Sequence, residues 1–216
     1  MSVVLFGCGS KMIVDVEESC ARLGLDIVAI VKNFEGPHYA LSSERVMNAD
    51  KLEPDIKLHP YAVPFFTPGH RLAARRDAVA QGFTREATII DPTAVVALST
   101  TIGSGSYVNC GAVIGGATRI GAFVFINRNA NVGHHVEIDD FASVGPGATI
   151  CGSARLGYGA VAAAGAIILE NVKIGRNSVV AAGAVVRESI GDHCLVVGNP
   201  ARMIDSTYAG FKNLPV

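Results

Sequence analysis

The stretch of the chain best suited to chemistry is NVGHHVEIDD, residues 131–140, in which two adjacent histidines stand among acidic side chains. An imidazole can take up a proton near neutral pH, so a positioned histidine can act as a general base. The chain has only six histidines, and His134 and His135 are its one adjacent pair. An arbitrary pair of this kind is more often solvated surface than a site. The elements that hold the pair therefore decide how it is interpreted.

A repeat of six residues surrounds the pair. From residue 90 to residue 191 the sequence divides without a gap into hexads such as IGAFVF, INRNAN, VGHHVE and IDDFAS. The first residue of each hexad is Ile, Val or Leu except at Ala162, and the fifth is Ala, Ser, Thr or Val except at Ile190. Neither a helical period of 3.6 nor a strand period of 2 produces this pattern, whereas six-residue repeats occur in parallel β-helices.

Each hexad is predicted to form one short strand and one turn, so that three hexads make a triangular coil of 18 residues. The aliphatic first residue points into the lumen, where full burial of such a side chain contributes roughly 1.5–3 kcal/mol. In VGHHVE the lumen residue is Val132, which leaves His134 and His135 in the turn and directed outward.

The hexads resemble those of the hexapeptide-repeat acyltransferases. That resemblance implies a left-handed coil, a homotrimer, and active sites in the grooves between neighbouring prisms. The segment after the last hexad, DHCLVVGNPARMI, resembles the end of the coil in the acetyl-CoA users of this class, chiefly through residues 198–202. Acetyl-CoA is accordingly the expected co-substrate, and Asn199 and Arg202 are expected to contact it.

The first 85 residues read as a small α/β unit. VVLFGCGS predicts a buried strand with a glycine turn, residues 11–23 a helix, residues 26–31 a strand, VPFFTPGH a third strand and loop, and RLAARRDAVAQGF a helix. A glycine turn before a helix can present backbone N–H groups to a phosphate. Met12 stands where a dinucleotide fingerprint has its third glycine, so NAD binding is disfavoured. Arg71–Asp77 has the spacing of a solvated helix face.

An α/β unit ahead of a hexapeptide prism resembles the bacterial sialic-acid O-acetyltransferases and nucleotide-amino-sugar N-acetyltransferases (the NeuD/PglD type). We therefore expect a Rossmann-like domain over residues 1–86 that binds a nucleotide-linked sugar, a left-handed β-helix over 87–204, and a tail over 205–216. Where the family carries Gly-His in its front loop and aspartates after the second strand, this chain has other residues. By position, the expected sugar-nucleotide contacts are Gly9, Ser10, Lys11, Lys32 and Asn33.

The same resemblance assigns roles along the prism. His134 matches the family's catalytic histidine, and His135 replaces the carboxylate that usually follows it. The group that orients His134 is left open among Glu137, Asp139, Asp140, a backbone carbonyl and a residue of an adjacent subunit. The remaining matches are Asn127 as an acceptor contact, Gly152 as an oxyanion donor one coil after His134, Ser143 in place of a histidine that contacts acetyl-CoA, and Ala164 and Ala182 along the pantetheine arm.

Composition limits the other functions. A net charge of −1 without a long basic run argues against nucleic-acid binding, and no apolar run reaches the roughly 18–20 residues that span a bilayer. The amino terminus lacks the basic segment of a signal peptide, and five scattered cysteines suit free thiols in a cytoplasmic protein. No metal is expected, because zinc enzymes built on this prism need three converging histidines, and His193 lies three coils beyond the pair.

The leading hypothesis is thus an acetyl-CoA-dependent acetyltransferase that acts on a nucleotide-linked sugar, with an amino sugar favoured. An O-acetyltransferase on a sialic-acid-like sugar is the nearest alternative. A second alternative is a trimeric ligand-binding protein without catalysis. The positions at which this chain differs from the family's site residues favour it.

Overall fold

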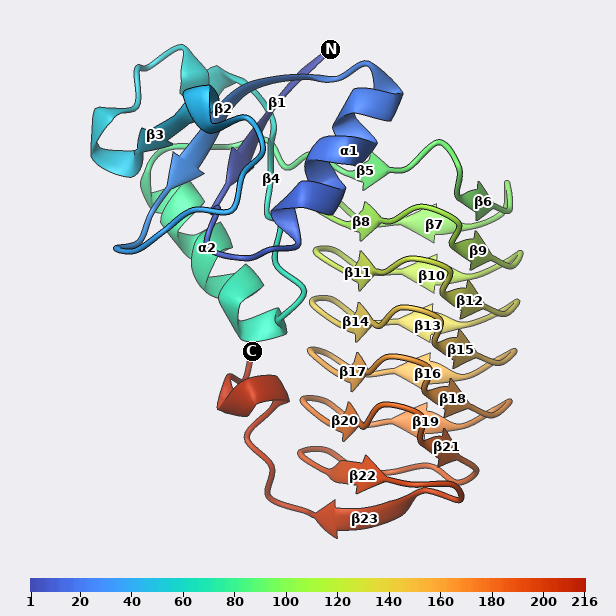
Figure 1. The fold of residues 1–216 in the computed structure, drawn as a ribbon. Helices are drawn as coiled ribbons and strands as arrows, with labels where there is room; N and C mark the ends of the chain where they lie inside the picture. The colour runs from blue at the N-terminus through green and yellow to red at the C-terminus, as the bar shows by residue number, and fades with distance from the viewer.

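The computed structural model describes all residues, Met1–Val216. Its elements form two parts that lie side by side: an α/β unit, here called the front domain, and a prism of stacked coils (Figure 1). The front domain contains β1 (Ser2–Phe6), α1 (Ile13–Leu23), β2 (Asp26–Lys32), β3 (Val46–Asn48), β4 (Tyr61–Ala62) and α2 (Pro68–Ala80), with short 3-10 turns at Ser43–Arg45, Ala49–Lys51 and Ile56–Leu58.

The front sheet is parallel throughout and has the order β3-β2-β1-β4. Successive side chains of a strand point to opposite faces. Val3 and Leu5 accordingly join the core formed with α1, while Val4 and Phe6 join the core formed with α2. One helix therefore covers each face of the sheet. The sequence predicts β1 and β2, whereas its third strand, expected in VPFFTPGH, is wrong: β4 ends at Ala62, just before that stretch, and α2 already begins at Pro68. β3 is too short and too polar to stand out.

From residue 89 to residue 186 the prism consists of two-residue strands that pair in parallel with the strand 18 residues further on, as Arg119 does with Glu137. Its strands are β5 (Ile89–Ile90), β6 (Val95–Val96), β7 (Thr101–Ile102), β8 (Tyr107–Val108), β9 (Val113–Ile114), β10 (Arg119–Ile120), β11 (Phe125–Ile126), β12 (Asn131–Val132), β13 (Glu137–Ile138), β14 (Ser143–Val144), β15 (Thr149–Ile150), β16 (Arg155–Leu156), β17 (Val161–Ala162), β18 (Ile167–Ile168), β19 (Lys173–Ile174), β20 (Val179–Val180), β21 (Val185–Val186), β22 (Leu195–Val197) and β23 (Arg202–Asp205). At the end of the prism, β22 pairs in parallel with β20, and β23 pairs with β22 in the antiparallel direction. These sheets, stacked in a repeating pattern, fit a left-handed parallel β-helix.

The lumen confirms the predicted register of the hexads. First-position residues such as Val108, Ile126 and Val144 are fully buried in one continuous cluster, together with fifth-position residues such as Ala130 and Ala148. The turn residue at the fourth position takes a left-handed backbone conformation, with φ 53° at Asn129, 57° at His135 and 64° at Gly147. Glycine and asparagine reach that conformation at the least cost, which explains their frequency there.

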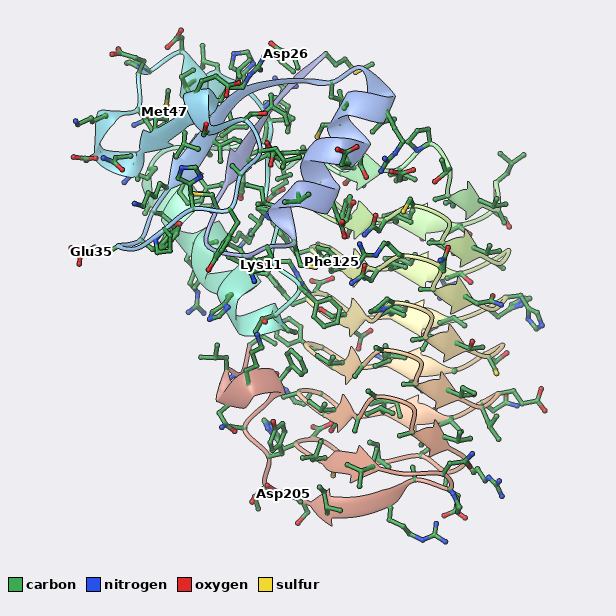
Figure 2. The ribbon with its side chains drawn as sticks, viewed as in Figure 1. Lys11, Asp26, Glu35, Met47, Phe125 and Asp205 are labelled. Atoms are coloured by element: carbon green, nitrogen blue, oxygen red, sulfur yellow. The ribbon has the colours of Figure 1, made fainter.

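The three faces of the prism differ in character. The face of β5, β8, β11 and β14 is covered by the front domain, toward which Phe125 points (Figure 2). The face of β7, β10, β13, β16 and β19 carries charged residues at its outward positions. The face of β6, β9, β12, β15, β18 and β21, here called the neutral face, shows only Val95, Val113, Asn131, Thr149, Ile167 and Val185.

Arg71 corrects one expectation, because it is 1% exposed and does not lie on a solvated helix face. Its guanidinium donates to five carbonyl oxygens, those of Phe65, Phe66, Phe123, Phe141 and Ala142, and to the Ser143 hydroxyl. Burial lowers its pKa to about 9, which still leaves it charged at neutral pH. A single side chain from α2 thereby joins the front domain to two successive coils of the prism.

Asp91 makes a second connection between the two parts. Its buried carboxylate accepts hydrogen bonds from Ser19 and Arg22 of α1 and from Thr93 in the first coil. Burial by itself would raise the pKa of this carboxyl group, but these hydrogen bonds outweigh burial and hold the pKa below its usual value. No helix of the protein has the length and apolar character needed to cross a bilayer.

Candidate active site

His134 lies on the outside of the prism, in the turn that joins β12 of the neutral face to β13 of the charged face. Its imidazole rests against Gly152 of the next coil: a Cβ added at Gly152 would lie 2.8 Å from Cε1 and 3.0 Å from Nε2 of His134. Only glycine leaves room for the ring at this place. The backbone N–H of Gly152 donates to no acceptor within the chain, so a free hydrogen-bond donor stands beside the imidazole.

His135 is the side chain that contacts His134. The two Nδ1 atoms lie 3.1 Å apart and the rings meet edge to face, with centroids 5.2 Å apart. Two nitrogens at that distance share one hydrogen. When His134 supplies it, its tautomer is fixed with a lone pair on Nε2, which is the atom a general base must present.

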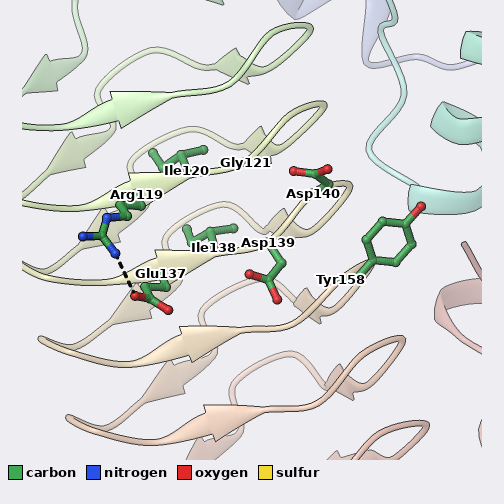
Figure 3. A pocket seen from close by; sticks show the side chains of 8 residues that line it. All are labelled: Arg119, Ile120, Gly121, Glu137, Ile138, Asp139, Asp140 and Tyr158. Atoms are coloured by element: carbon green, nitrogen blue, oxygen red, sulfur yellow. Dashed lines mark hydrogen bonds and ion pairs between the residues drawn. The ribbon is translucent and has the colours of Figure 1, made fainter.

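The three carboxylates considered as orienting groups are bonded elsewhere. Glu137 pairs with Arg119 and Arg155, Asp139 pairs with Arg155, and Asp140 accepts the backbone N–H of Ala122. The Arg119–Glu137 pair lines a depression of about 440 Å³ on the charged face. Asp140 and Tyr158 also line this depression (Figure 3). Within one chain His135 is therefore the only side chain that forms a hydrogen bond with His134.

A groove of about 860 Å³ runs between the front domain and the corner where the covered face of the prism meets the neutral face. We call it the front groove. It brings together six residues that the sequence selects for binding: Gly9, Ser10, Lys11, Asn127, Ala164 and Ala182. Lys11 reaches it from the start of α1 (Figure 2). The groove does not include His134, His135 or Gly152, which lie at the other edge of the neutral face.

The polar atoms of the front groove suit an extended ligand. Asn127 is 4% exposed; its Oδ1 accepts from Asn109 and from the backbone of Arg128, while its Nδ2 donates to no atom of the chain. The backbone N–H groups of Ala164 and Ala182 are likewise without an acceptor in the chain. A column of unpaired donors along a groove edge can receive the carbonyl groups of a bound molecule.

Besides the two histidines, six of the selected residues lie outside the front groove. Ser143 is fully buried, receives a hydrogen bond from Arg71 and donates to the carbonyl of Phe66, so the expectation that it contacts CoA finds no support in its surroundings. Asn199 and Arg202 are exposed near the last coil. Gly152 lies beside His134, outside the front groove. Lys32 and Asn33 line another cavity, of about 750 Å³, at the ends of β2 and β3.

Sequence reasoning missed several residues of the front groove. His70, at the end of VPFFTPGH, lines it, as do Tyr208, Phe211 and Lys212 from the carboxy-terminal tail. Partial burial lowers the pKa of His70, and the nearby Lys212 ammonium lowers it further, which favours the neutral imidazole. In the sequence, the aromatic residues of YAGFK were the one indication that the tail could bind a ligand. Only the packing of the tail against the prism brings them into the front groove.

No group of three or more His, Cys, Asp or Glu side chains within the chain is arranged to hold a metal ion. No family model and no curated protein matches the sequence. Solved structures do match it. The chain is similar to perosamine N-acetyltransferase from Caulobacter crescentus, in a form with one histidine replaced by asparagine and bound to CoA and GDP-perosamine; identity is 27%, the TM-score is 0.85, and the match covers 95% of this chain and 97% of that one.

It is also similar to the acetyltransferase domain of PglB from Neisseria gonorrhoeae FA1090 in complex with acetyl coenzyme A, with 28% identity, a TM-score of 0.82, and coverage of 94% and 98%. WeeI from Acinetobacter baumannii AYE shares the fold at 20% identity and a TM-score of 0.78, over 94% of this chain and 100% of that one. These similarities confirm the resemblance to hexapeptide-repeat acyltransferases that the repeat predicts.

Proposed function

We propose that this protein is an acetyl-CoA-dependent acetyltransferase that acts on a nucleotide-linked amino sugar, with His134 as general base. The observation that carries the proposal is a glycine-seated imidazole with a free backbone donor beside it, in a chain that matches two CoA-bound acetyltransferases over nearly its whole length. The amine of the sugar attacks the thioester carbonyl carbon while Nε2 of His134 takes its proton. The C–S bond then breaks, and CoA leaves as the thiol after receiving that proton.

His135 and Gly152 support this chemistry from either side of the base. The Nδ1 of His135 accepts from His134 and holds the tautomer, a task that a carboxylate performs in other general-base systems. The Gly152 N–H, which has no acceptor in the chain, is the proposed donor to the oxyanion formed on the thioester carbonyl, a kind of contact whose removal costs roughly 2.7–4 kcal/mol elsewhere.

The site is completed by a second copy of the chain. In one chain the front groove lies along one edge of the neutral face, and His134 lies along the opposite edge. If three copies pack their neutral faces around a common axis, the His134 edge of each meets the front groove of the next. The uncharged and partly apolar composition of this face, with Val95 63% exposed and Val113 45% exposed, supports such an interface.

CoA release with Ellman's reagent, measured over a panel of nucleotide-linked amino sugars, tests the activity. His134→Asn should lose about 10²–10⁴-fold in kcat. The matched control is His59→Asn, which changes a histidine of the front domain and should retain activity. Turnover by wild-type protein that His134→Asn leaves intact would refute the role of His134, and no turnover together with no acetyl-CoA binding would refute the enzyme.

Mixing two inactive variants tests the shared site. Ala164→Trp fills the front groove at an exposed position, and His134→Asn removes the base. In randomly assembled trimers, about one quarter of the sites pair an intact His134 with an intact groove. Recovery of about that fraction of wild-type activity is expected. If each site lay within one chain, the mixture would stay inactive.

A further inference from the structure

Three cavities lie in series away from the prism, and each shares lining residues with the next. The front groove shares Gly9, Phe65 and His70 with a smaller cavity of about 290 Å³ in the front domain. That cavity in turn shares Asn33, Phe34 and Asp77 with the cavity at the ends of β2 and β3. A ligand that holds its reacting group in the front groove can therefore extend to Asn33 and Asp77. We call the 290 Å³ cavity the base slot.

The base slot has aromatic walls held in place by the glycine loop. A Cβ at Gly9 would lie 3.0 Å from Cζ of Phe34, and the ring of Phe65 packs so closely on Gly7 that a Cβ there would overlap it. Both rings thus pack directly against the backbone of the glycine loop. Aromatic faces of this kind stack with nucleobases.

The polar end of the base slot is a joined pair of side chains. Asn33 Nδ2 donates to Asp77 Oδ2 at 2.8 Å, and Asp77 forms no ion pair with any Lys or Arg. The second hydrogen of the Asn33 amide and both carboxylate oxygens of Asp77 keep free bonding capacity. From Asn33 to Asp77, the base slot therefore offers one hydrogen-bond donor, the Asn33 amide, followed by two acceptors, the Asp77 carboxylate oxygens.

We infer that the base slot selects guanine, an inference that rests on the proposed function because it names the nucleotide of the same acceptor. The Watson–Crick edge of guanine presents one acceptor, O6, followed by two donors, N1–H and N2–H, which is the complement of the pair. Uracil and thymine place a carbonyl oxygen where the second donor is needed, and so would face the carboxylate of Asp77. Cytosine presents one donor and two acceptors, and adenine has no second donor.

Calorimetric titration of the whole protein with nucleoside diphosphates tests the inference. GDP should bind about 10- to 100-fold more tightly than UDP, CDP or ADP, since a good bidentate contact discriminates to that extent. IDP differs from GDP only by lacking the 2-amino group, and it should bind about tenfold more weakly than GDP. Equal binding of GDP and UDP, or of GDP and IDP, would overturn the inference.

Two matched variants locate the effect. Asp77→Asn removes the paired acceptors at an exposed position; it should abolish the preference for GDP over IDP and reduce the preference for GDP over UDP, because the uracil carbonyl no longer faces a carboxylate. Asp50→Asn removes an equal charge from the neighbouring cavity and should leave both preferences intact. A loss of the same size in both variants would assign the effect to general charge and overturn the role of Asp77.

Acetyl transfer separates this inference from the proposed function. CoA release with a UDP-linked amino sugar but not with its GDP-linked counterpart would keep the acetyltransferase and refute guanine selection. Preferential GDP binding in a protein that releases no CoA with any acceptor would keep the base slot and refute the acetyltransferase.

Discussion

The bond between His134 and His135 leads to a quantitative prediction for His135→Gly and His135→Asn. Position 135 has φ 57°, and equivalent turns of the same prism carry glycine at residue 147 and asparagine at residue 129 with φ 64° and 53°. Both replacements therefore suit the backbone. Glycine removes the acceptor that faces His134, whereas the amide oxygen of asparagine can replace it.

The size of the effect follows from the change in charge on His134 during the reaction. A hydrogen bond between neutral groups contributes about 0.5–1.5 kcal/mol, and one to a charged group about 1.5–3 kcal/mol. The bond to His135 strengthens when His134 becomes an imidazolium, so only the difference, about 1–1.5 kcal/mol, lowers the barrier. Its loss in His135→Gly should reduce kcat about 5- to 15-fold. His135→Asn should stay within about threefold of wild type.

Steady-state CoA release measures both variants, and a thermal melt checks that each is folded. The KM for acetyl-CoA should not change, because the bond acts mainly in the transition state. If His135→Gly kept the wild-type kcat, His135 would not orient the base. If glycine and asparagine lowered kcat equally, the imidazole would be needed for something other than accepting a hydrogen bond.

Three further predictions concern close packing and buried charge. Gly152→Ala should displace the His134 ring and lower kcat by about 10²-fold with little change in the thermal midpoint, as CoA release and a melt would show. Arg71→Met should leave buried carbonyls unpaired and lower the free energy of unfolding by roughly 3–5 kcal/mol in a urea titration, with Arg71→Lys in between. Because the folded-state pKa of Asp91 is lowered, its contribution is full above an unfolded pKa of about 3.9 and is lost as the pH falls toward the folded value. Asp91→Asn should therefore be less stable than wild type at pH 7, and the difference should shrink below about pH 4.

The sequence by itself determined the prism and the register of His134. The lumen position takes an aliphatic side chain and the fifth position, except at Ile190, a small one. The composition of each hexad therefore shows which of its residues point inward. That local rule places His134 in an outward turn and stacks it with Gly152 without knowledge of any other contact.

Only the tertiary structure decided which distant segments meet. Arg71 lies in a run of charged residues that reads as surface, yet it is buried because carbonyl oxygens from one loop and two successive coils converge on it. His70 and the tail enter the front groove through packing between segments more than a hundred residues apart. The pair of Asn33 and Asp77 joins a strand end to a helix in the same way. Such contacts produce no repeating pattern in the sequence, because each occurs only once. The residue types that form them are also common on solvent-exposed surfaces.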